Sequence, residues 1–138
     1  MSNKHILKLT HKEAVVKLYG ENATIDIDLQ TDLKLADETV NGQSQVVHIQ
    51  AIYWACKNSQ DATIGRWDGT ALEGETYLSG TGTFEYAGFT DNAYATQDIR
   101  AVLGNGATVI LVLKKVSGYT KDDQNLGVNT EVPNPEGN

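Results

Sequence analysis

Apolar and polar residues alternate along several stretches of the chain, a period of two that is typical of β-strands with one buried face. In residues 23–30 (ATIDIDLQ), Ile25, Ile27 and Leu29 share one side, opposite acidic, hydroxyl and amide side chains. Residues 107–116 contain an unbroken apolar run, which favours a central strand covered on both faces. The pattern predicts a fold built from strands.

Residues 46–56 (VVHIQAIYWAC) alternate less regularly. The face expected to be buried carries Val47, Ile49, Ala51, Tyr53 and Ala55. The opposite face starts with His48 and Gln50 and then becomes apolar. We therefore expect this strand to enter a second contact along its length.

Turn signals separate these runs. Asn41-Gly42, Asp68-Gly69 and residues 104–106 (GNG) supply the residue types that tolerate a positive φ in hairpin turns. No amphipathic helix is evident, and residues 12–19 suit a strand better than a helix. Strand signals at intervals of about 8–12 residues predict an all-β, single-domain antiparallel β-sandwich or jelly-roll-like fold over residues 1–119.

The composition changes after residue 119. Residues 120–138 are polar, contain both prolines of the chain and have just three aliphatic side chains, Leu126, Val128 and Val132. Such a segment cannot bury enough apolar area to offset the entropy lost on ordering. It is predicted to be a flexible C-terminal arm that orders on a neighbouring molecule, with a frayed terminus as the alternative.

Charge and composition exclude several classes of partner. A net charge of −7 argues against nucleic acid, which is bound through Lys and Arg, and the densest basic site, Lys114-Lys115, is interpreted as a solvated strand end. No apolar run approaches the roughly 20 residues that span a bilayer. Cys56 is the sole cysteine, which agrees with a reducing compartment. We expect synthesis in the cytoplasm and neither a nucleic-acid nor a membrane partner.

Candidate chemistry is sparse. His5, His11 and His48 are scattered, form no close metal-ligand pattern and are expected to face solvent. Asp26 and Asp28 share a strand face, but a hard cation needs about six oxygen ligands and the sequence does not supply the others. No metal or cofactor is predicted.

Two further stretches invite a catalytic interpretation. Cys56 lies beside apolar residues that would raise its pKa, so a packed thiol is preferred to a nucleophile. Residues 79–83 (SGTGT) lack the Gly-Lys-Ser/Thr ending of a phosphate loop and continue an alternating run from 78 to 86. Glycines in such a strand admit a large residue from the opposing sheet or a close backbone approach. The chain is therefore predicted not to be an enzyme.

The stretch 63–70 (TIGRWDGT) places a cation, an indole and a carboxylate in succession. On a strand, Arg66 and Asp68 would share a side as an exposed ion pair, while Trp67 would enter the core or form a contact surface. The favoured interpretation is a strand, an Asp-Gly turn and another strand. A sugar-binding platform built on Trp67 or Trp54 is the alternative.

The order of segments is informative as well. A strand with Trp54 precedes a Gly-spaced strand containing Ser79, Gly80 and Gly82, and the last strand reads "G-x-G-T-x-I-L-x-L-K-K-V-x-G-Y". The matching residues of that strand are Gly104, Gly106, Thr108, Ile110, Leu111, Leu113, Lys114, Lys115, Val116, Gly118 and Tyr119. Over roughly residues 14–119 the chain resembles small β-rich virion proteins of tailed bacteriophages, especially marine and cyanobacterial phages.

The resemblance implies a capsid decoration or cement protein that binds the outer surface of the major capsid protein lattice and stabilises the head. A homotrimer would follow from a three-fold lattice position. The expected contact residues are Ile6, Leu7, Leu9, Trp67, Tyr119, Leu126, Val128 and Val132. The alternatives are another virion part, such as a head–tail adaptor, neck or tail protein, and a carbohydrate-binding module for host recognition.

Overall fold

The computed structural model describes residues 2–40, 42, 44–57, 60–86 and 94–121, and it confirms the all-β prediction. Strands dominate these residues and none of them is α-helical. The strands are β1 (Ser2–Leu9), β2 (Glu13–Ile27), β3 (Glu38–Val40), β4 (Val46–Cys56), β5 (Asp61–Trp67), β6 (Leu72–Ser79), β7 (Thr81–Glu85), β8 (Asp98–Ser117) and β9 (Tyr119–Lys121). Seven form one large antiparallel sheet, while β3 and β9 form a second, small sheet.

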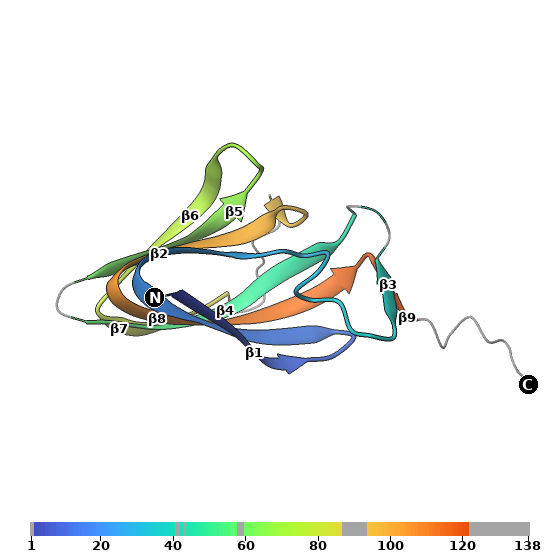
Figure 1. Ribbon diagram of the computed structural model, residues 1–138, viewed down its shortest axis with the longest axis horizontal. Coiled ribbons are helices and arrows are strands. Elements are labelled where there is room, and N and C mark those ends of the chain that lie inside the picture. The colour runs from blue at the N-terminus through green and yellow to red at the C-terminus, as the bar shows by residue number, and fades with distance from the viewer. Residues whose placement is uncertain (1, 41, 43, 58–59, 87–93, 122–138) are drawn as a thin grey trace, which may run out of the picture.

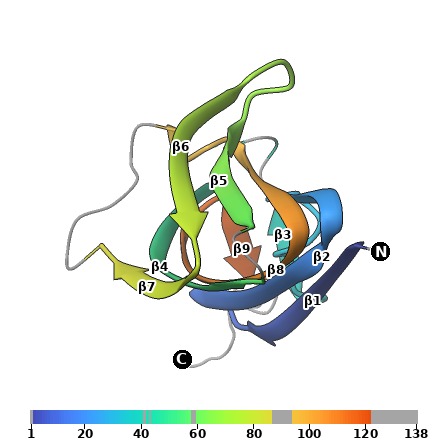
Figure 2. The same cartoon turned by 90° about the vertical axis from the view of Figure 1, so that its left-hand side faces the viewer.

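The long strand β8 organises the large sheet. Strand β2 pairs with β8 along almost its whole length. On the other edge, β5 pairs with the first part of β8 and β4 with the second part, so the sheet divides into two branches. Strands β6 and β7 extend these branches, and β1 extends the sheet beyond β2. Viewed end-on, the strands curve around a common interior (Figure 2).

The sheet bends where the sequence predicted a turn. Residues 104–106 lie inside β8, so the predicted hairpin turn at this position is wrong. The β2–β8 register shifts beside Gly106, whose φ of 92° favours glycine, and Asn22 on β2 has a φ of 49°. These two residues bend the paired strands without ending them, as a β-bulge does.

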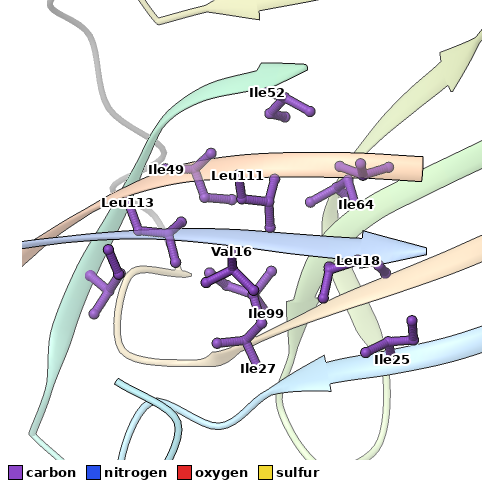
Figure 3. Close-up of a cluster of buried hydrophobic side chains, with 14 of the residues drawn as sticks. Val16, Leu18, Ile25, Ile27, Ile49, Ile52, Ile64, Ile99, Leu111 and Leu113 are labelled. Carbon is purple, nitrogen blue, oxygen red and sulfur yellow. The ribbon is translucent and has the colours of Figure 1, made fainter. Parts of the chain in front are cut away.

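The core lies inside the curved sheet and draws aliphatic side chains from β2, β4, β5 and β8 (Figure 3). The alternation predicted for residues 23–30 is confirmed, because Ile25, Ile27 and Leu29 are all buried. The central position of residues 107–116 is also confirmed. Its second face is half-buried at Ile110 and Val112, so the strand is not fully covered on both sides as predicted.

A bulge in strand β4 explains the irregular pattern of its sequence. Val47 and Ile49 are buried, as predicted, but the register with β8 shifts between Ile49 and Ala51. Beyond the shift Ile52 is fully buried, whereas Tyr53, predicted to be buried, is 40% exposed. One extra residue therefore reverses which face of the strand contacts the core.

The run of residues 78–86 is two strands, and the predicted single strand is wrong because Gly80 forms a turn between β6 and β7. The expectation that a glycine makes room for a large residue holds at Gly82. A Cβ there would lie 2.6 Å from the Trp54 ring. Trp54 comes from the paired strand β4 rather than from an opposing sheet.

The small sheet lies at one end of the molecule, on the right of Figure 1, away from β7. Glu38, Thr39 and Val40 of β3 pair with Lys121, Thr120 and Tyr119 of β9. Thr120 and Lys121, predicted to begin the C-terminal arm, are therefore strand residues. The predicted contacts Leu126, Val128 and Val132 lie outside the described residues.

Candidate binding surfaces

The stretch 63–70 combines a buried cation with a capped turn. Arg66, next to the last residue of β5, faces the interior and is only 2% exposed. Its Nη1 donates to the Gln97 carbonyl oxygen at 2.8 Å and its Nη2 to that of Val47 at 2.5 Å. The predicted exposed ion pair with Asp68 is therefore wrong, because the guanidinium satisfies backbone carbonyls inside the fold.

The predicted Asp-Gly turn is confirmed. Asp68 Oδ1 accepts hydrogen bonds from the backbone N–H groups of Thr70 and Ala71, both at 2.7 Å. These bonds lower the pKa of the Asp68 carboxyl. The turn connects β5 to β6 and brings the carboxylate beside Trp67 at the end of β5.

Trp67 is half-buried and stacks against a cation from the neighbouring strand. The Arg100 guanidinium carbon lies 3.5 Å from the centre of the indole ring, within the range of a cation–π interaction. Arg100 also forms a bidentate pair with Asp26, at 2.6 and 2.8 Å. This pairing raises the pKa of Arg100. The Asp26 carboxylate is thereby used in an ion pair, whereas Asp28 lies beyond the end of β2.

A pocket of about 630 Å³ opens beside Trp67, and we call it the Trp67 pocket. It is lined by Asp26, Asp28, Leu29, Gln30, Gln45, Trp67, Asp68, Gly69, Thr96, Gln97 and Asp98. Burial raises the pKa of Asp98, whose Oδ1 accepts from the Leu29 N–H, and the nearby Asp28, Asp26 and Asp32 carboxylates raise it further. The sequence indicated Trp67 and Asp68, but Asp98 and Gln97 lie some 30 positions away and had no local signal.

A second cluster of ionisable groups joins the two sheets, and we call it the Glu38 cluster. The Lys115 ammonium donates to Glu38 Oε1 at 2.8 Å and to the Thr10 carbonyl oxygen at 2.9 Å. His11 Nδ1 lies 2.5 Å from Glu38 Oε2. Lys115 is 5% exposed, so the prediction of a solvated lysine pair holds for Lys114 but is wrong for Lys115. The His11 side chain, expected to face solvent, is 31% exposed and therefore does so only in part.

Opposing effects act on the two charges of this cluster. Burial would raise the pKa of Glu38, but the Leu35 N–H and the Lys115 and His11 side chains outweigh it, so the pKa lies below 4.5. Burial lowers the pKa of Lys115 more than its pairing with Glu38 raises it. The cluster satisfies its own hydrogen bonds and links β3 to β8, which indicates a structural role.

Tyr119 belongs to this interior as well. It is 7% exposed, its hydroxyl donates to the Leu29 carbonyl oxygen at 2.5 Å, and the Lys115 ammonium lies 4.4 Å from its ring centre. Burial raises its pKa. The prediction of Tyr119 as a partner contact is therefore wrong, because its surface is already used in packing.

Strand β1 carries the remaining predicted contacts. Within the large sheet β1 pairs with β2 alone among the described strands, so it forms an edge. Ile6 is 38% and Leu7 54% exposed, whereas Leu9 packs against the core. The register with β2 shifts between Ile6 and Lys8, which places Leu7 at a bulge. Ile6 and Leu7 therefore remain accessible to a partner, and Leu9 largely does not.

The second tryptophan and the cysteine have packing roles. Trp54 packs over Gly82 and donates from Nε1 to the Ser79 carbonyl oxygen at 2.9 Å. Cys56 is half-buried against the core, and burial, followed by the Asp61 carboxylate, raises its pKa as the sequence predicted. Among the described residues, no three His, Cys, Asp or Glu side chains are grouped to hold a metal ion.

No protein-family model matches the chain, and no curated protein is significantly similar to it. Within the part of the chain that the structure describes, no helix is long and apolar enough to cross a membrane.

Proposed function

We propose that the protein is a non-enzymatic capsid decoration or cement protein that binds the outer surface of a phage major capsid protein lattice. The proposal extends the sequence resemblance and draws support from how the described ionisable groups are used. The Glu38 cluster, Arg66 and the Arg100–Asp26 pair are hydrogen-bonded within the fold. Such use favours a stable binding module over a catalytic site.

The observation that carries the proposal is the exposed apolar edge of β1. An edge strand presents unpaired backbone groups to a partner, and lysines commonly protect such edges. Here Lys4 is turned toward Asp32, at 2.6 Å, and Lys8 pairs with Glu13. The lysines are thus held by their own chain, which leaves Ile6 and Leu7 as the exposed apolar side chains of the edge.

The charge of the chain supports an external position. A net charge of −7 would be repelled by packaged nucleic acid, so the outer face of the shell is the more favourable location. A repeated capsid lattice offers many identical sites, and a trimer would match its three-fold positions. Virion localisation and the major capsid protein as partner follow from this proposal.

Co-sedimentation with undecorated expanded heads tests the proposal. The wild-type protein is expected to saturate at a fixed copy number per capsomer. Leu7→Glu should weaken binding about tenfold or more, because it places a charge at the docking edge. Tyr77→Ser is the matched control, since Tyr77 is 76% exposed on the distant strand β6. Binding that never saturates, or equal losses in both variants, would contradict the proposal.

A further inference from the structure

The Trp67 pocket has the size of a small-molecule site and is dominated by hydrogen-bond acceptors. Its volume of about 630 Å³ lies within the roughly 300–1,000 Å³ of typical ligand pockets. The indole of Trp67 supplies an aromatic wall. The carboxylates come from Asp26, Asp28, Asp68 and Asp98. None of the described lining residues is Lys or Arg. A ligand that supplies donors to the carboxylates therefore suits this lining.

The negative charge of the pocket is only partly balanced. Asp26 is paired with Arg100, and outside the lining Asp32 is paired with Lys4. Asp28 and Asp98 accept backbone N–H groups through Oδ1, and the described residues provide no hydrogen bond to either Oδ2. An uncharged ligand would desolvate these carboxylates without neutralising them, whereas a cation would do both.

The amide of Gln97 is an independent sign of a missing donor. Its side-chain oxygen is fully buried and has no hydrogen-bond partner among the described residues. Buried oxygens of this kind are rarely left unsatisfied in a folded protein. Gln97 lines the Trp67 pocket, and Arg66 fixes its backbone carbonyl from within the core. The backbone of the pocket wall at Gln97 is therefore held in place from the core.

We propose that the Trp67 pocket binds an organic cation, either a primary ammonium or a guanidinium group, between the Trp67 indole and the Asp28, Asp68 and Asp98 carboxylates. Arg100 already stacks on the indole, and the part of the ring that lines the pocket suits the apolar stem of such a cation. The source is a lysine or arginine side chain of a partner polypeptide or a free polyamine. The site is independent of β1, so it stands or falls separately from the capsid proposal.

Nuclear magnetic resonance titration of the full chain tests this site. The Trp67 indole N–H, identified by comparison with Trp54→Phe, reports occupancy. Titrants at constant ionic strength are acetyl-lysine methylamide, spermidine, maltose and acetyl-norleucine methylamide, which has the lysine shape without its charge. We expect saturable shifts from the lysine derivative and none from the norleucine derivative or maltose. A response to spermidine as well would show that a free amine suffices, whereas a response to the lysine derivative alone would identify a polypeptide source.

Asp98→Asn should weaken binding about tenfold, because it removes one charge-assisted contact while an amide oxygen can still accept from the Leu29 N–H. Glu85→Gln, which removes an exposed carboxylate on β7, should leave the affinity unchanged. If Asp98→Asn does not fold, the wild type provides the test instead. Its affinity for the lysine derivative should fall severalfold when the salt concentration is raised about tenfold. Equal binding of maltose, unsaturable shifts, or unchanged affinity in Asp98→Asn would overturn the proposal.

Discussion

Removing the Lys115 ammonium should destabilise the protein far more than removing its neighbour. Lys115→Met retains the aliphatic stem but loses the hydrogen bonds to Glu38 and Thr10, at 2.8 and 2.9 Å, and the contact with the Tyr119 ring. Glu38, 1% exposed, would then be a buried carboxylate without its ammonium partner. Breaking a buried pair from one side costs about 3–5 kcal/mol. Because Leu35 N–H and His11 remain beside the carboxylate, the lower half of that range is expected.

Equilibrium unfolding in urea, followed by tryptophan fluorescence, measures this difference. Lys114→Met is the matched control, because Lys114 is exposed and its loss should change the free energy of unfolding by no more than about 0.5 kcal/mol. The double variant Lys115→Met/Glu38→Gln should lose about 1–3 kcal/mol less than the sum of the single variants. Equal stability of the two lysine variants, or strict additivity, would refute the assigned role of the pair.

Three other outcomes follow from the structure. The pKa of Glu38 is lowered in the folded state, so its stabilising contribution is fully present above its ordinary pKa of 4.5 and is lost as pH falls from there through the folded-state pKa. The stability difference between wild type and Glu38→Gln should therefore shrink as pH falls below 4.5 in a urea series, and a pH-independent difference would contradict this. Gly118 and Gly69 both have a positive φ, 91° and 100°, but a Cβ on Gly118 would lie 2.5 Å from Gln45 Cα, whereas one on Gly69 would meet open space. Gly118→Ala should therefore lower the free energy of unfolding by about 1–3 kcal/mol more than Gly69→Ala, and similar melting temperatures would refute the clash. Gly82→Ala should displace the Trp54 ring and shift its emission relative to wild type, whereas an unchanged spectrum would show that the ring does not pack there.

Local patterns predicted the strands because alternation and turn chemistry are local properties. The burial of Ile25 and Ile27 and the Asp68 turn are confirmed for this reason. The bend at residues 104–106 was missed because a glycine in a strand and one in a turn look alike in sequence. The bulge in β4 was missed because no residue type between Ile49 and Ala51 marks it. Their difference depends on what the neighbouring strands offer.

The candidate site depends on contacts between distant residues, and there the sequence was a poorer guide. Lys115 was assigned to solvent because its partner Glu38 is 77 positions away. Arg66 was paired with the nearby Asp68, but its carbonyl partners come from β4 and from the segment before β8. Long polar side chains in a strand can face either solvent or a buried acceptor, and only the tertiary fold decides which.

A reconstruction of the virion tests the central claim most directly, because it locates every copy of the protein at once. The account predicts density of this fold repeated at regular positions over the outer shell, with the β1 edge and Leu7 against the major capsid protein. Density confined to the neck, the tail or one vertex, or a decorated shell with β1 facing solvent, would contradict it.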